Sequence, residues 1–561
     1  MKKYCFCILL ICVATRLWGI SDSSSQLRER LYVQTDKHLY LAGEQVLIKV
    51  VTTDAELKPI DFSKVAYIEL VDSHASRIQI MISVSNATGT GQMQLPVDLP
   101  SGYYRLKAYT QYMRNEGSDA FFEKQIAVLN TFQSGYHLTE IETEIVPIST
   151  RSVENGNPRL QPDKTTYTKR EHGKLTINGL PENIHTLTVS VVGKEIVPVA
   201  WAGRLFLENR TKRAAEFTDE FIPEYEGHII TGKIINNETE RQQGDLIVSP
   251  AISFPGDEIR FYSGQKTEDG DLRFFTSGVL GTTEIATIAY NTDERFRVDI
   301  ASPFVLTHTP EQLSPLLIDS ACYRTLLERS VALQLSHYFT DSDDAENPKI
   351  SQSNFRAEPT RKFPLDDYTR FTTMREVFIE FITGARFRRN AGKWEISILV
   401  STSNYMSFGI MPLVLLDGVP VVDHDAIYNY DPLLVEHINL YYGPFIMGGY
   451  RFDGIVELLT YRGLHQNLTL NRASQVLKYE MPQLPYRFNA PDYSIENNRI
   501  SRVPDGRHTL LWQPDVRTEG KTSVSVPFNT SDLTGEFQAI VEGITKDGKI
   551  FFAETVFKVE N

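Results

Sequence analysis

The densest group of side chains able to do chemistry lies between residues 423 and 431. It consists of Asp423, His424, Asp425, Asn429 and Asp431. Carboxylates at such spacing are suited to a divalent cation. The same side chains are also typical caps of turns and of helix starts. We favour the capping role, so the sequence predicts no metal site and no cofactor.

Common catalytic signatures are missing from the sequence. There is no HExxH, no GxSxG and no phosphate-binding GxxxxGK[ST] pattern, because Asp515 stands where the loop ending in Gly520-Lys521-Thr522 would need glycine. The chain has 12 histidines, and none lies in such a signature. We therefore predict a protein that is not an enzyme and that does not hydrolyse peptides, esters or glycosides.

Aromatic side chains are concentrated in a glycine-rich stretch that follows the polar group. Tyrosine has an apolar face and a polar tip, which suits contacts with partner proteins or sugars. The alternative to partner binding is that these tyrosines simply face solvent, since half of them alternate with core positions. Four residues are predicted to bind a partner: Tyr441, Tyr442, Phe445 and Tyr450.

The segment 413–463 must position both groups, and its turns are marked clearly. A buried strand over Leu413–Leu416 is followed by Asp417-Gly418, a dipeptide typical of tight turns with positive φ. Asp431-Pro432 starts a helical turn. A glycine-rich loop at 443–454 then leads to a last strand over Ile455–Thr460. This order predicts a compact α+β unit.

The motifs LLDGVPV, DP…VE, YGP and DGIVEL in this segment resemble the plug domain of TonB-dependent outer-membrane receptors. The resemblance covers about Tyr368 to Gly463, within a predicted domain 361–465. It implies an outer-membrane setting, with an outer-membrane protein or export machinery as the partner. The chain ends at residue 561, too soon after Gly463 to encode the about 22 strands of a transporter barrel. The alternative is an unrelated α+β domain with the same turns.

The start of the chain predicts export. Lys2 and Lys3 precede a short apolar run and the small residues Gly19 and Ser21, a pattern typical of a cleaved signal peptide over 1–21. The run is too short to span a membrane, and no later segment does so. We expect a periplasmic, outer-membrane-associated or cell-surface protein. Its net charge of −14 makes it a poor nucleic-acid binder.

Residues 28–131 show short apolar or alternating runs separated by turns, which predicts a β-sandwich. The turn formed by Asp36-Lys37, Tyr40 and Gly43-Glu44 resembles that of macroglobulin MG2-like domains in Bacteroidetes-type envelope proteins. The pattern DKxxYxxxE returns at Asp163. This internal repeat predicts a second β-sandwich over 147–215. Macroglobulins that trap proteases covalently need a Cys–Gln thioester, which the context of Cys322 does not provide.

The remaining segments complete a mainly β chain. Residues 218–306 resemble a small carboxypeptidase-regulatory-like sandwich, and 466–561 are predicted to form a separate C-terminal β domain. Between them, 307–360 is predicted to be a helical connector, and the spacing of Met374, Val377, Phe378 and Phe381 predicts a helix. The expected fold is a set of tandem β-sandwiches with one small α+β plug-like domain.

Two classes of function fit these features. The first is a non-enzymatic cell-envelope binding or scaffold protein whose plug-like domain docks with an outer-membrane partner. The alternatives are a macroglobulin-like protease-interacting protein and a surface adhesin or carbohydrate binder.

Overall fold

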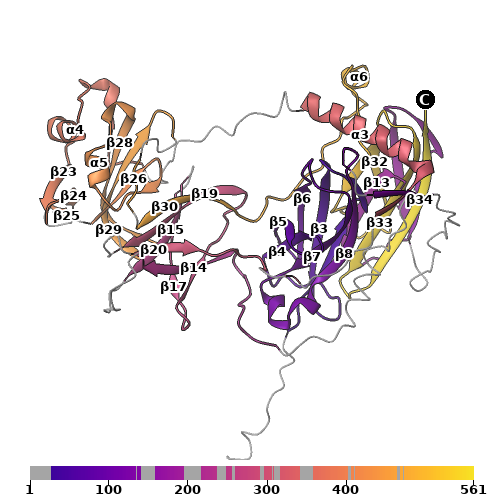
Figure 1. Cartoon of the computed structure of the whole chain (residues 1–561), viewed down its shortest axis with the longest axis horizontal. Helices are drawn as coiled ribbons and strands as arrows, with labels where there is room; N and C mark the ends of the chain where they lie inside the picture. Colours follow the sequence, from indigo (N-terminus) through magenta and orange to yellow (C-terminus); the bar gives the residue numbers. More distant parts are fainter. Residues whose placement is uncertain are drawn as a thin grey trace, which may run out of the picture.

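The structure is a computed structural model that describes residues 27–133, 136–139, 158–194, 217–236, 248–255, 259–290, 296–305, 308, 316–340, 358–401, 406–409, 411–463, 468–471 and 473–561. The expected signal peptide over 1–21 lies outside the described residues. Figure 1 shows two lobes, one built from the strands at the two ends of the chain and one from its middle. The fold is mainly β, as predicted.

The first β-sandwich, called sandwich A, contains eight strands in two sheets. One sheet has the order β1 (Arg30–Thr35), β3 (Gln45–Thr53), β6 (Thr88–Gln94). The other has the order β2 (Leu39–Leu41), β8 (Phe122–Leu129), β7 (Gly102–Tyr109), β4 (Val65–Val71), β5 (Ser76–Ser83). Two short 3₁₀ turns, η1 (Tyr112–Glu116) and η2 (Ser118–Ala120), link β7 to β8. Fully buried aliphatic and tyrosine side chains fill the space between the sheets.

Sandwich B repeats this topology strand for strand. Its first sheet has the order β10 (Arg159–Pro162), β12 (His172–Asn178), β32 (Ser523–Asn529). Its second has the order β11 (Thr166–Thr168), β34 (Ile550–Glu560), β33 (Gly535–Thr545), β13 (Ile184–Gly193), β31 (Thr509–Gln513). The single parallel pair is also conserved between them, β2 with β8 and β11 with β34. The tandem sandwiches expected from the repeated motif are therefore present.

The prediction of separate domains at 147–215 and 466–561 is wrong. The hydrogen bonds of β12 to β32 and of β13 to β31 and β33 place both segments in the same two sheets. The first four strands of sandwich B make five strand pairings, and only that of β10 with β12 lies among themselves. The other four pairings need the last four strands, which come from the end of the chain. All other domains after residue 194 are inserted between the fourth and fifth strands of sandwich B.

Sandwiches A and B meet face to face across a buried polar layer. Lys49 of β3 donates to the hydroxyl of Thr188 at 2.9 Å, and Thr509 donates to the carboxylate of Asp36 at 2.7 Å. Burial lowers the pKa of Lys49 to about 7. Ile544 and Ile550 of sandwich B extend the apolar core of sandwich A. The two sandwiches thus share one continuous packed interface.

Sandwich C is a third, differently wound pair of sheets. One sheet has the order β17 (Gln265–Lys266), β18 (Asp271–Phe275), β14 (Ile229–Asn236), β20 (Phe296–Ile300). The other has the order β16 (Arg260–Ser263), β15 (Ser249–Phe254), β19 (Thr282–Tyr290), β30 (Ser474–Glu480). Its strands lie in the predicted segment 218–306 except β30, which was expected in the C-terminal domain. The seven cross-strand pairs between β19 and β30 are the reason for this difference.

Helix α3 (Ser320–Thr340) occupies the predicted helical connector, but it covers sandwich A. The preceding strand β21 (Leu316–Asp319) pairs in parallel with β9 (Tyr136–Thr139), and both lie against the apolar outer face of β2 and β8. Arg329 of α3 donates to both carboxylate oxygens of buried Glu44, at 2.8 and 2.6 Å. None of the described helices is both long and apolar enough to cross a membrane.

Candidate functional site

The α+β domain between β20 and β30 contains every candidate site residue. Its central sheet has the order β22 (Arg361–Pro364), β28 (Val435–Met447), β29 (Tyr450–Thr460), β26 (Pro412–Leu416), β27 (Val419–Pro420). A second sheet has the order β23 (Ala385–Asn390), β24 (Lys393–Ser401), β25 (Met406–Gly409). The short helical elements are η3 (Leu365–Asp367), α4 (Met374–Glu380), α5 (Asp425–Tyr428) and η4 (Pro432–Leu434). The predicted helix at Met374 is confirmed as α4.

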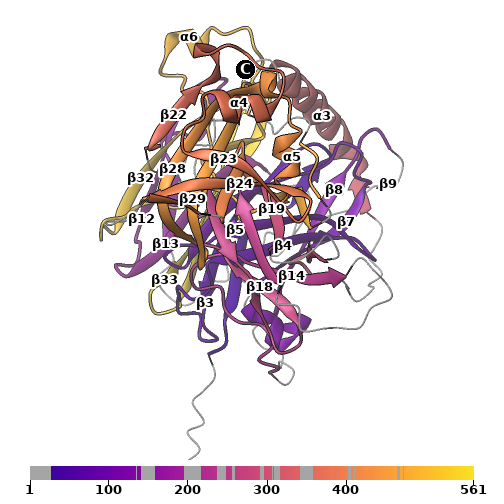
Figure 2. The ribbon, with the colours of Figure 1, turned by 90° about the vertical axis from the view of Figure 1, so that its left-hand side faces the viewer.

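Two apolar clusters lie on opposite faces of the central sheet. One face packs against α4, α5 and the β23–β25 sheet through side chains such as Phe378, Ile396 and Val456. The other packs against sandwich C through Leu415 and Phe452, which contact Phe261 and Ile288. The domain therefore packs on sandwich C through one face of its central sheet. Its α4 and β23–β25 layer lies at the far end of the lobe in Figure 1 and faces the viewer in Figure 2.

The predicted turn at Asp417-Gly418 is confirmed. Both residues have positive φ, 47° and 82°, and Leu416 pairs with Val419 across the turn. The carboxylate of Asp417 also accepts hydrogen bonds from the main-chain N–H and the hydroxyl of Thr460, both at 2.7 Å. Asp417 thus fixes the end of β29 to the turn. The glycine-rich stretch 443–454 differs from the expected loop, because it continues β28 and turns tightly into β29 at Gly448-Gly449.

The polar side chains at 423–431 accept hydrogen bonds from main-chain N–H groups. Asp431 accepts from the N–H of Leu433 at 2.9 Å and caps η4, as the capping alternative predicts. Asp425 and His424 Nδ1 accept from the N–H groups of Trp394 and Ile396 in β24. Burial lowers the pKa of His424 to about 4, so the ring is a neutral acceptor at physiological pH. Within the described residues, no three potential ligands gather as a metal site.

The four predicted partner-binding residues make contacts inside the chain. Tyr441 is buried, and its hydroxyl donates to Glu457 at 2.9 Å. Tyr450 donates to the carbonyl of Pro250 at 2.9 Å, and its ring packs on Phe261 and Tyr290 of sandwich C.

Tyr442 and Phe445 are half-buried. The hydroxyl of Tyr442 donates to the carbonyl of Thr383 at 3.1 Å, and Phe445 packs against the cluster shared with sandwich C. The expectation of an exposed aromatic surface is therefore wrong for Tyr441, and Tyr450 serves the junction of two domains. Sandwich C covers this face because β28 and β29 extend beyond the domain core to reach it.

Sequence reasoning missed the buried carboxylate of Glu457. It lies on the face of β29 toward sandwich C, where Asn439 and Tyr441 both donate to Oε2 at 2.9 Å. Burial raises the pKa of Glu457. The signal was present in the sequence IVELLT, since a lone glutamate within an apolar strand must be buried with a partner.

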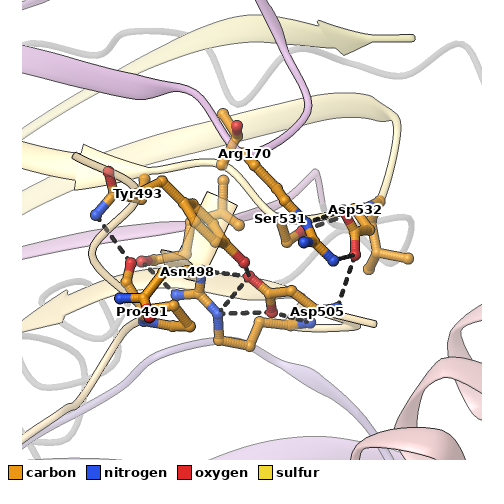
Figure 3. A network of polar contacts seen from close by, with 12 residues as sticks. Arg170, Pro491, Tyr493, Asn498, Asp505, Ser531 and Asp532 are labelled. Carbon is orange, nitrogen blue, oxygen red and sulfur yellow. Dashed lines mark hydrogen bonds and ion pairs between the residues drawn. The ribbon is translucent and has the colours of Figure 1, made fainter. Parts of the chain in front are cut away.

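A second polar network, shown in Figure 3, lies on sandwich B. Arg170 binds the carboxylate of Asp532 at 2.7 and 2.6 Å and donates to the carbonyls of Ser501 and Val503. Tyr493 donates to Asp505 at 2.7 Å, and Arg507 binds the same carboxylate. This network holds the returning segment around α6 (Glu496–Arg499) against the strands of sandwich B. The donors of this network are matched by acceptors, so its role is to stabilise the fold.

Residues 30–123 match the family model described as the MG2 domain, which spans most of sandwich A. This part of the chain is macroglobulin-like. No curated protein matches the chain significantly. Among solved structures, the chain is similar to Escherichia coli alpha-2-macroglobulin activated by porcine elastase, with 9% identity and a TM-score of 0.25 over 95% of this chain and 44% of that one. Salmonella alpha-2-macroglobulin reacted with methylamine gives 8% identity and a TM-score of 0.24, over 95% and 39%.

This chain thus spans less than half the length of these two proteins. With TM-scores this low, neither similarity adds to the argument for fold or function.

Proposed function

We propose that this protein is a non-enzymatic scaffold of the cell envelope whose α+β domain docks with an outer-membrane protein or with export machinery. The observation that carries the proposal is the asymmetry of the α+β domain. One face of its central sheet is bound to sandwich C. The opposite layer, formed by α4 and β23–β25, lies at the end of the lobe away from the three sandwiches (Figure 1).

The contact between sandwiches C and A supports a role in presenting the α+β domain to a partner. The hydroxyl of Tyr67 in sandwich A donates to Glu224 at 2.9 Å. His228 lies 3.0 Å from the same carboxylate and 2.8 Å from the hydroxyl of Tyr479 in β30. Tyr67, Glu224 and His228 contact one another, and His228 continues the network to Tyr479. Such a network orders the joint between the two lobes, as a scaffold that presents a domain requires.

The resemblance of the α+β domain to receptor plugs and of sandwich C to carboxypeptidase-regulatory-like domains supports the envelope setting. Both domains stand in the order that receptors of this class show. Export of the chain by the segment 1–21 belongs to the same proposal.

Recovery of partners from envelope fractions tests the proposal. The tagged full chain should retain an outer-membrane protein after chemical crosslinking. Ile379→Glu, which charges a 63% exposed side chain of α4, should reduce that recovery several-fold, since a charge opposes burial at an interface. Val97→Glu is the matched control, because Val97 is 73% exposed on sandwich A. Equal recovery with both variants, or no outer-membrane protein with the wild type, would contradict the proposal.

A second candidate is a protease-interacting protein, and the MG2 match over 30–123 favours it. Incubation with elastase separates the two candidates. A protease-interacting protein should be cleaved at one site and retain the protease in gel filtration, whereas a docking scaffold should show neither result.

A further inference from the structure

Strand β23 forms one edge of the distal sheet and exposes alternate main-chain groups. It is joined to β24 by the two-residue turn Ala391-Gly392, with φ of 47° and 89°. In such a hairpin the residues flanking the turn form a hydrogen-bonded pair, and the pairs then alternate. The N–H and C=O groups of Phe387 and Arg389 therefore point away from β24.

Strand β24 supports this assignment. Trp394 and Ile396 lie opposite Arg389 and Phe387 in the register. Their N–H groups point away from β23 and bond to Asp425 and His424. By the same alternation, the groups opposite them point outward from β23. Within the described part of the chain, no strand pairs with this outer edge.

The edge strand carries an unusual charge for this chain. The six residues of β23 include three arginines, Arg386, Arg388 and Arg389, although the whole protein has a net charge of −14. The guanidinium of Arg386 lies 3.9 Å from the ring centroid of Phe408, and Arg388 pairs with Glu395. Arg386 and Arg388 share one face of the strand because their positions differ by two. These contacts hold both guanidinium groups over one face of the sheet, against β24 and β25.

The charge selects the kind of strand that fits. A second copy would bring arginine against arginine, and like charges directly opposite each other destabilise a strand pair. An acidic strand would instead place carboxylates on the face of the sheet that carries the positive charges of Arg386 and Arg388, while its main chain pairs with Phe387 and Arg389. Resting on the proposed docking function, we propose that β23 binds an extended acidic segment of a partner protein by strand addition.

Direct binding of a peptide tests this assignment. The probe is a fluorescently labelled peptide of about ten residues that alternates glutamate and valine, since alternate side chains of a strand share one face. The full chain should bind it, and a peptide of alternating lysine and valine should bind at least about tenfold more weakly because its charges repel the arginines. Equal binding of the two peptides would overturn the proposal.

Charge reversal on β23 distinguishes binding at this strand from an effect of the protein's net charge. Arg386→Glu combined with Arg388→Glu should weaken binding of the acidic peptide by about tenfold or more. Lys233→Glu combined with Lys521→Glu is the matched control, because those side chains are 68% and 70% exposed on other sandwiches. It changes the net charge equally and should bind as the wild type does. Equal loss in both double variants would contradict a site at β23.

A proline variant tests the main-chain contribution. Arg389→Pro removes the outward N–H and the charge, whereas Arg389→Gln removes only the charge. Proline is tolerated where an edge N–H faces outward, so thermal unfolding of the two variants should agree. Binding should be several-fold weaker for Arg389→Pro. If the two variants bind equally, the contact is purely electrostatic, as with an anionic lipid or nucleic acid, and strand addition is refuted. Recovery of the envelope partner in that case leaves the scaffold proposal standing.

Discussion

The hydroxyl groups of Tyr40 and Tyr167 make the same hydrogen bond in two sandwiches. Each donates to the aspartate four residues earlier, at 2.8 Å to Asp36 and at 2.7 Å to Asp163. Each aspartate also accepts from a main-chain N–H eleven residues later, that of Leu47 or Lys174. The repeated motif therefore closes the turn between the first and third strands of each sandwich. It is structural in both copies.

The two tyrosines differ in what surrounds their aspartates, and this predicts unequal costs. Asp36 is 2% exposed at the interface of sandwiches A and B, whereas Asp163 is exposed. Water replaces the lost donor at Asp163 but not at Asp36. Tyr40→Phe should lower the free energy of unfolding by about 2 kcal/mol and Tyr167→Phe by under about 1 kcal/mol. Urea titration of both variants measures this, and equal costs would contradict the assigned burial.

At the scale of elements, the attachment of α3 to sandwich A depends on Glu44. Burial opposes ionisation of this carboxyl, but Arg329 and Lys37 outweigh it and lower its pKa from 4.5 to about 2. Because the folded pKa lies below the unfolded one, the stabilisation is complete above pH 4.5 and is lost as the pH falls toward 2. It amounts to about 3 kcal/mol at about 1.4 kcal/mol per pKa unit.

Acid titration of stability tests this attachment. The wild type should lose stability between pH 4.5 and 2 more steeply than Glu44→Gln, which cannot titrate there. The variant should also be less stable at neutral pH, since Arg329 keeps no charged partner at this position. Hydrogen exchange of α3 as a function of pH is the direct readout. Parallel pH profiles for the two proteins would show that Glu44 does not hold the helix.

The junction of the β28–β29 hairpin with sandwich C depends on Tyr450. Its ring centroid lies 5.8 Å from that of Phe261 and 5.7 Å from that of Tyr290. Tyr450→Ala removes these contacts and the hydrogen bond to Pro250, at a cost of about 2–4 kcal/mol. Faster hydrogen exchange should follow in β15, β16 and the hairpin turn, with α4 and β23 unchanged. Uniform exchange across the α+β domain would show that Tyr450 stabilises the domain and not its junction.

At the scale of the whole molecule, local patterns predicted elements but not their long-range partners. Asp417-Gly418, Asp431-Pro432 and the spacing around Met374 are set within a few residues, and the structure confirms each one. The repeat of DKxxYxxxE also identified the second sandwich. These signals are local, since turn conformation and helix periodicity depend on neighbours in the chain.

What escaped prediction involves residues far apart in the chain. Alternation in Ser523–Asn529 predicts a strand but does not say which strand it joins. The sequence around Glu44 does not indicate that Arg329 is its partner, and the sequence around Tyr450 does not indicate its contact with Phe261. Partner choice depends on the fit of whole faces, so an insertion between the fourth and fifth strands of a sandwich leaves little trace in short motifs.

The pairing of β12 with β32 tests the nested architecture most directly. The hydroxyls of Thr176 and Ser525 lie 3.2 Å apart on neighbouring strands, 349 residues apart in sequence. In a Cys322→Ser background without residues 1–21, Thr176→Cys combined with Ser525→Cys should form a disulfide under mild oxidation, detected by mass spectrometry of the digested protein. Two free thiols in a folded protein, each accessible to alkylation, would contradict a sandwich shared by the two ends of the chain.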